Sequence, residues 1–150
     1  MLEPLAPGVV ARLAALGGEF LALPHLPVPS KDAAGHTNSI SFSFAYRLPT
    51  QRVRINLKMA FARQGTVWSL TYCSYHCGPS DDTAATHFRI CWNSHHPFHF
   101  HLRGYESYGD RGHIAAEKAD PPITKDALDF LALVEKFLPD KRKLPLQVKP

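Results

Sequence analysis

The sequence lacks a long apolar run and has few cysteines, and both shortages limit what the chain can be. None of its apolar runs approaches the roughly 20 residues that a membrane-spanning helix needs. Its N-terminus, MLEPLAPGVVARLAALGG, lacks the basic region of a secretory signal, so we expect a cytoplasmic protein with no membrane partner. Three cysteines, an odd number, argue against a disulfide framework.

Several common catalytic motifs are also missing. The sequence contains no G-x-S-x-G, no H-E-x-x-H and no Walker phosphate-binding pattern. Serine-triad, zincin-type and P-loop chemistry therefore have no support. Internal repeats and low-complexity tracts are absent as well, which leaves an ordinary globular domain.

The composition favours a folded domain with a modestly basic surface. The 150 residues are 45% hydrophobic and 20% charged, which fits a single domain with a real core. Lys and Arg number 17 against 13 Asp and Glu, and nine histidines can add positive charge at mildly acidic pH. Such a surface suits a polyanionic partner, although it is equally common on proteins that bind no nucleic acid.

Hydrophobic periodicity predicts an α+β fold. About five strands with alternating apolar residues follow one another through short loops, which indicates an antiparallel meander sheet. A further short strand is expected near residues 113–116, within a Gly-rich loop. Helical spacing near each end of the chain predicts one helix before the sheet and one after it, both covering one sheet face. The expected segments are a helix with an irregular connector (1–37), the sheet with a His-rich site (38–117), a C-terminal helix (118–138) and a mobile basic tail (139–150).

The stretch PFHFHL places two histidines on one side of a strand. Because side chains alternate along a strand, His99 and His101 share a face while Phe98, Phe100 and Leu102 point to the core. We expect this row to project from an exposed polar face of the sheet. The same alternation assigns further polar side chains to that face: Arg52, Arg54, Lys58, His87 and Arg89.

Imidazoles gathered beside cations can cleave a phosphodiester without a metal or other cofactor. One imidazole takes the proton of a ribose 2′-hydroxyl, another protonates the leaving oxygen, and a cation stabilises the phosphate charge. The candidates for this catalysis are His99, His101, His113 and Arg103. The candidates for binding the substrate, RNA, are Arg89, Asn93, His95, His96, Tyr105, Arg52 and Arg54.

Two other interpretations of these residues stay open. The histidines can be plain polar surface, or the same sheet face can bind nucleic acid or zinc without turnover. A zinc site would draw on Cys73, Cys77, Cys91 and His95, since zinc accepts Cys and His in tetrahedral sets. The spacing of Cys73 and Cys77 is looser than the C-x-x-C of a zinc knuckle, and no second Cys pair is present.

The sequence resembles the TumE-type toxin family of bacterial toxin–antitoxin systems in the order of several short segments. After Tyr72 and Tyr75 come FRICWN, HHPFHFH, GHI and DALDF. The resemblance covers roughly residues 52–138. The chain departs from the family at Trp92, where the family tends to have an acidic residue. The resemblance implies a small cytoplasmic endoribonuclease toxin neutralised by a protein antitoxin. A homodimer stays open as a further partnership.

Overall fold

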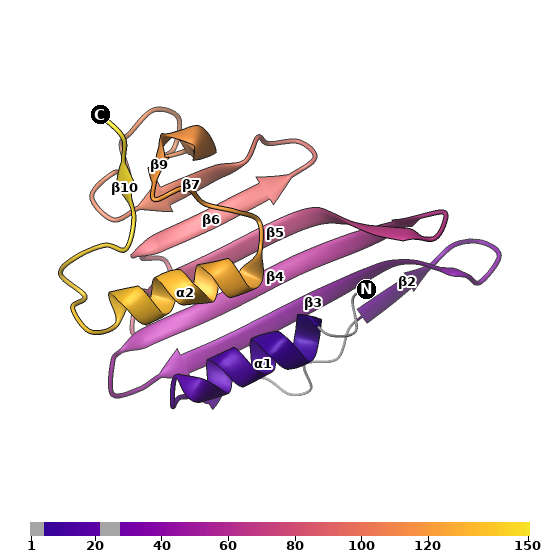
Figure 1. Cartoon of the computed structure of the whole chain (residues 1–150), viewed down its shortest axis with the longest axis horizontal. Helices are drawn as coiled ribbons and strands as arrows, with labels where there is room; N and C mark the ends of the chain where they lie inside the picture. The colour runs from indigo at the N-terminus through magenta and orange to yellow at the C-terminus, as the bar shows by residue number, and fades with distance from the viewer. Residues whose placement is uncertain (1–4, 22–27) are drawn as a thin grey trace.

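The computed structural model describes residues 5–21 and 28–150 and has one long antiparallel sheet with two helices on one face (Figure 1). The strand order is β1-β3-β4-β5-β6-β7-β8, with β2 also paired to β3, and a separate ribbon joins β9 to β10. The elements in chain order are α1 (Leu5–Ala15), β1 (Glu19–Phe20), β2 (Val28–Lys31), β3 (Thr37–Leu48), β4 (Val53–Gln64), β5 (Val67–Pro79), β6 (Phe88–Asn93), β7 (His99–Leu102), β8 (Ile114–Ala115), η1 (Ala116–Lys118), β9 (Ala119–Asp120), α2 (Ala127–Phe137) and β10 (Gln147–Val148).

One face of the sheet is apolar across its whole central width. A row of directly paired residues crosses five strands, and each of its side chains is buried: Phe44, Leu57, Tyr75, Ile90 and Phe100. Burying one such side chain contributes roughly 1.5–3 kcal/mol. The row therefore fixes the register, since a slip by one residue would expose it to water.

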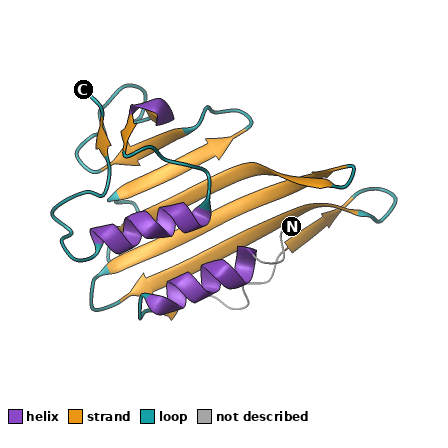
Figure 2. Cartoon of the chain, in the orientation of Figure 1, coloured by secondary structure: helices purple, strands orange, loops and turns teal. Residues whose placement is uncertain are grey.

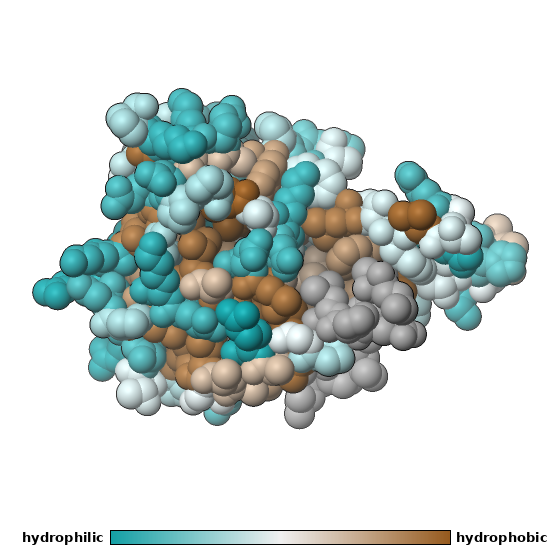
Figure 3. Space-filling view, viewed as in Figure 1, coloured by the Kyte–Doolittle hydropathy of each residue, from teal (hydrophilic) through white to brown (hydrophobic). Residues whose placement is uncertain are grey.

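Both helices pack on this apolar face and on each other (Figure 2). Asp126 caps α2 by accepting a hydrogen bond from the backbone N–H of Leu128 at 2.8 Å. Arg12 of α1 and Glu135 of α2 form an ion pair at 2.9 Å. In Figure 3, hydrophobic surface shows between hydrophilic residues on this side. No helix within residues 5–21 and 28–150 is long and apolar enough to span a membrane.

The α+β class and the antiparallel meander are confirmed, with more strands than the five expected. The additional strands are short and, apart from β8, form where the sequence predicts connectors or loops. Residues 1–4 and 22–27 of the predicted helix and connector segment lie outside the described residues. The C-terminal helix begins only at Ala127, because Pro121 and Pro122 interrupt the expected stretch and the side chain of Asp126 caps the helix there.

The C-terminal segment is packed on the domain, so the prediction of a mobile tail is wrong. Strand β10 pairs with β9, and the side chain of Leu146 is 1% exposed. Arg103 donates a hydrogen bond to the carbonyl oxygen of Lys141 at 3.0 Å. Apolar residues within the basic tail supply the burial that holds it in place.

The second face of the sheet carries polar side chains and, within the described residues, no helix. A second row of paired residues crosses it, namely Ser43, Lys58, Ser74, Cys91 and His99. We call this surface the open face. The candidate site lies on it, over β5 to β8.

Candidate functional site

Four imidazoles meet at the β6–β8 end of the open face. The rings of His99 and His113 are stacked with centroids 4.3 Å apart, and that of His101 lies 5.1 Å from His99 and 4.8 Å from His113. His96, in the loop before β7, lies 6.2 Å from His113. We call these four residues the histidine cluster. It contains all three predicted catalytic histidines.

Strand pairing brings the cluster together. Within β7, the period of two puts His99 and His101 on the same face. Strand β8 then pairs with β7 so that Ala115 lies opposite His99, which returns His113 to the same edge. The turn before His113 depends on Gly112, whose φ of 72° favours glycine.

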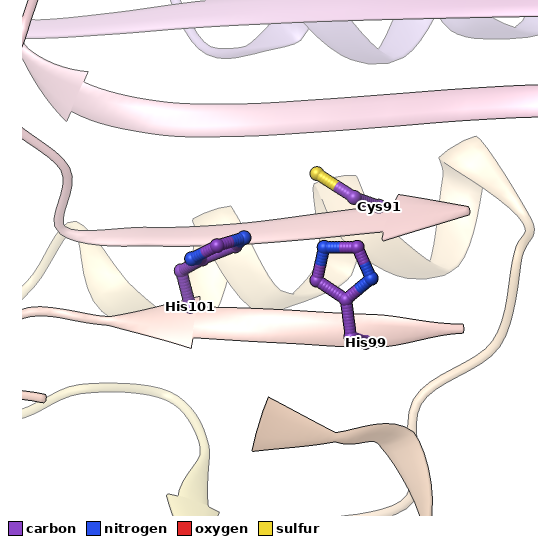
Figure 4. Close-up of side chains that lie close together, drawn as sticks. All are labelled: Cys91, His99 and His101. Carbon is purple, nitrogen blue, oxygen red and sulfur yellow. The ribbon is translucent and has the colours of Figure 1, made fainter. Parts of the chain in front are cut away.

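Strand β6 adds a thiol to the site. Cys91 lies directly opposite His99, and its sulfur is 3.8 Å from the hydroxyl oxygen of Ser74 on β5. The guanidinium of Arg89 donates to that hydroxyl at 3.1 Å. Figure 4 shows Cys91 on one strand and His99 and His101 on its neighbour, with the three side chains close together.

The cluster borders a cavity of about 280 Å³. Arg89 and Arg111 both line it, and within residues 5–21 and 28–150 its lining contains no carboxylate. A second cavity of about 330 Å³ shares Tyr72, Ser74 and Arg89 with the first and continues to Arg54 and Lys58. The two cavities form a cationic groove along the open face.

A backbone carbonyl fixes the tautomer of His99. Its Nδ1 lies 2.7 Å from the carbonyl oxygen of Pro97. A carbonyl only accepts hydrogen bonds, so Nδ1 carries the hydrogen and donates it. In the neutral ring, Nε2 therefore keeps its lone pair for a proton or a metal ion.

The surroundings keep the central imidazoles neutral. Burial, and then the positive charge that His99, His113 and Arg89 can carry, lower the pKa of His101 to about 4. Burial also lowers the pKa of His99, whose side chain is 7% exposed rather than free on the surface as expected. At neutral pH both rings are thus proton acceptors rather than donors.

Arg103, the predicted catalytic cation, lies away from the cluster. It contacts Nδ1 of His87 at 3.1 Å and the carbonyl oxygens of Lys141 and Arg142. The strand β7 ends at Leu102, so the alternation that would have placed Arg103 beside His101 is lost. Its contacts indicate a structural role in attaching the C-terminal segment.

His87 was expected on the open face, but it lies before β6 and follows a different course. Its ring centroid is 5.0 Å from that of Phe137 in α2, on the helix side of the sheet. The alternation seen in β6 therefore does not extend to this residue.

The predicted substrate-binding residues divide between the groove and other places. Four of them line the groove: Arg54, Arg89, Asn93 and His96. The side chain of Asn93 also accepts hydrogen bonds from the backbone N–H groups of His95 and His96. The remaining three are not among the residues lining either cavity of the groove: Arg52, His95 and Tyr105.

The predicted zinc set does not come together. Cys73 and Cys77 pair with Trp92 and Phe88 and are fully buried on the apolar face. Cys91 points to the open face, and His95 is exposed in the next loop. Strand alternation explains the separation, because Cys73 and Cys77 share the apolar face of β5 whereas Cys91 on β6 faces the other side.

Ser74, His76 and Arg111 are among the groove residues that are not sequence candidates. Ser74 and His76 alternate outward on β5, where bulky residues on both faces hide the period of two. Arg111 reaches the cavity from a loop whose course no periodicity predicts. Only the register of β5 against β6 would have identified Ser74, as the partner of Cys91.

Comparisons of the chain with protein-family models, with curated proteins and with solved structures found no match. The geometry of the open face is therefore the basis for the function proposed below.

Proposed function

We propose that this protein cleaves RNA without a metal ion, using the histidine cluster for proton transfer. The observation that carries the proposal is the stacking of His99 and His113, whose ring centroids are 4.3 Å apart. Arg89 lines the same cavity, and the described lining of that cavity has no carboxylate. Two imidazoles and a cation are the groups that such a cleavage requires.

The reaction assigns a separate task to each group. Nε2 of His99 takes the proton of the ribose 2′-hydroxyl, and the 2′-oxygen attacks phosphorus. The bond from phosphorus to the 5′-oxygen breaks, and His113 donates a proton to that oxygen. Arg89 stabilises the charge on the phosphate oxygens. The products are a 2′,3′-cyclic phosphate and a 5′-hydroxyl.

The resemblance to TumE-type toxins supports a biological setting for this activity. In that setting the protein is the toxin of a bacterial pair, acts in the cytoplasm, and is held inactive by a protein antitoxin. Expression of the chain in bacteria should then arrest growth, and His99→Ala should abolish the arrest. Growth at the normal rate with well-expressed wild-type protein would remove the toxin part of the proposal.

A substrate without the nucleophile tests the chemistry directly. We expect wild-type protein to cleave a single-stranded oligoribonucleotide in the presence of EDTA and to leave the 2′-O-methyl version intact. Cleavage of both would exclude attack by the 2′-oxygen. Salt-sensitive binding of the oligonucleotide with no cleavage would favour a nucleic-acid-binding module instead.

A further inference from the structure

Three potential metal-ligand atoms from two adjacent strands lie close together on the open face. The sulfur of Cys91 and one ring nitrogen each of His99 and His101 all lie within 4.8 Å of one another. Cys91 and His99 are directly paired across β6 and β7, and His101 follows two residues later on the same face. Figure 4 shows the three side chains projecting together from the two strands. Sheet strands hold such a set more firmly than a loop would.

Groups behind these atoms orient them. The Pro97 carbonyl accepts from Nδ1 of His99, the arrangement that metal-binding histidines use to direct the other nitrogen at an ion. The Ser74 hydroxyl, 3.8 Å from the Cys91 sulfur, can donate to a thiolate. Arg89 in turn donates to the Ser74 oxygen and so leaves the hydroxyl hydrogen free for sulfur. Both kinds of contact are typical outer-shell partners of a metal site.

The donor types select the class of ion. Hard cations such as Mg²⁺ and Ca²⁺ need oxygen ligands, and the described lining of this cavity has no carboxylate. Two imidazoles and a thiolate are the ligands that Zn²⁺ and related ions prefer. We infer that Cys91, His99 and His101 bind one Zn²⁺-class divalent ion, which displaces the thiol proton of Cys91.

The distances permit this with little movement. Zinc bonds of about 2.0–2.3 Å in a tetrahedron put ligand atoms roughly 3.3–3.6 Å apart. Donor atoms that lie within 4.8 Å of one another reach that spacing when side-chain rotations move them by about 1 Å. Three protein ligands leave a fourth position, which opens on the cavity beside His113.

The zinc site shares His99 with the proposed RNA cleavage, so metal binding and cleavage would compete. Bound zinc would occupy the His99 nitrogen that the proposed reaction needs, and this consequence rests on the proposed function. Metal binding itself does not, because it can be measured without any substrate.

Titration of the metal-free protein with Co²⁺, a spectroscopic substitute for zinc, tests the inference. We expect one Co²⁺ per chain, a thiolate-to-cobalt charge-transfer band in the near ultraviolet, and displacement of the cobalt by Zn²⁺. Cys91→Ser should abolish the band. Loss of an outer-shell partner alone weakens metal binding about 10- to 100-fold, so Cys91→Ser and His101→Asn should each weaken it by more than about tenfold.

Matched variants show whether the right residues are responsible. Cys77→Ala removes a fully buried thiol that does not line the cavity, and His95→Ala removes a histidine from the same segment, so both should bind cobalt like the wild type. Circular dichroism establishes that each variant is folded. Absence of stoichiometric binding by the wild type would overturn the inference. So would a charge-transfer band that survives in folded Cys91→Ser, or wild-type affinity in folded His101→Asn.

Discussion

His99 combines burial with a fixed tautomer. Its side chain is 7% exposed, and the Pro97 carbonyl holds the hydrogen on Nδ1. A ring held in this way loses little freedom when a substrate binds, so its Nε2 is already positioned for proton transfer. Burial, and then the positive charge that His113 and Arg89 can carry, disfavour a positive charge on it, which keeps the lone pair available.

Removal of one proton-transfer group should greatly slow RNA cleavage. Loss of a general acid or base costs about 10²- to 10⁴-fold, so we expect His99→Ala and His113→Ala each to lower kcat by that factor. His95→Ala is the control, because this exposed residue belongs to the same segment but does not line the cavity. Single-turnover rates in EDTA measure the effect. Full activity in either folded cluster variant would remove that residue from the mechanism.

His87 makes the stability of the domain depend on pH. The Arg103 guanidinium can only donate, so Nδ1 of His87 accepts and the ring is neutral. Burial first, and then the charge of Arg103, lower its pKa below the ordinary value of 6.5. The unfolded chain therefore binds more protons at mildly acid pH. The contribution of His87 to stability is present above pH 6.5 and is lost as the pH falls towards the lowered pKa.

His87→Asn tests this dependence, because its side-chain oxygen can still accept from Arg103 but does not titrate. We expect the free energy of unfolding of the variant to fall less than that of the wild type between pH 7.5 and pH 5, measured by urea denaturation. Other buried histidines of the domain titrate equally in both proteins and cancel from the difference. Parallel curves for the two proteins would contradict the account of His87.

At the scale of elements, the sequence predicts where strands form better than it predicts which strands pair with one another. The period of two in PFHFHL correctly places His99 and His101 on one face, because alternation is a local property of a strand. A short strand near residues 113–116 is also foreseeable, and β8 confirms it. Its pairing with β7 depends on contacts distant in sequence. The stacking of His113 on His99 therefore could not be predicted.

The difference between local patterns and contacts distant in sequence also explains the wrong predictions about Arg103 and the C-terminal segment. Alternation holds only as far as a strand continues, and β7 ends one residue before Arg103. The segment 139–150 looks mobile from its charge and its prolines, yet its buried apolar residues, the β9–β10 pairing and Arg103 hold it. Local composition cannot predict a contact that another element supplies.

Gly112 controls the position of His113 and offers a test at this scale. A methyl group at Gly112 would lie 3.1 Å from the carbonyl oxygen of Tyr105, and the φ of 72° strains any residue with a Cβ. We expect Gly112→Ala to lower the free energy of unfolding by about 1–3 kcal/mol and to reduce RNA cleavage in the folded fraction. Gly35 has a φ of 82°, and a methyl group there would meet no other atom within 4 Å. Gly35→Ala should therefore introduce a comparable backbone strain and leave RNA cleavage unchanged. Equal cleavage by both variants would show that the turn does not position His113.

At the scale of the whole molecule, the sheet divides two tasks between its faces. The apolar face and the helices make the core, which leaves the open face free for a partner. The groove there contains Arg54, Lys58 and Arg89. Because Arg54 lines this groove, we expect its guanidinium to contact a phosphate of bound RNA.

Salt dependence should reveal that contact. For single-stranded nucleic acids, each phosphate that the protein contacts adds about 0.7 to the magnitude of the slope of log K against log salt. Loss of one contact reduces the magnitude by the same amount. We therefore expect Arg54→Gln to bind single-stranded RNA more weakly, with a slope reduced by about 0.7. Arg63→Gln, at the exposed end of β4, is the control and should keep the wild-type slope. An unchanged slope for Arg54→Gln would place the RNA elsewhere.

The most direct test of the central claim is the chemistry of the cleaved ends. Mass spectrometry of an oligoribonucleotide treated with wild-type protein in EDTA identifies both new termini. Proton transfer from the 2′-hydroxyl to one imidazole, and from a second imidazole to the leaving 5′-oxygen, predicts a 2′,3′-cyclic phosphate on one product and a 5′-hydroxyl on the other. Products that end in a 3′-hydroxyl, or cleavage that chelation abolishes and zinc restores, would contradict a metal-independent reaction in the histidine cluster.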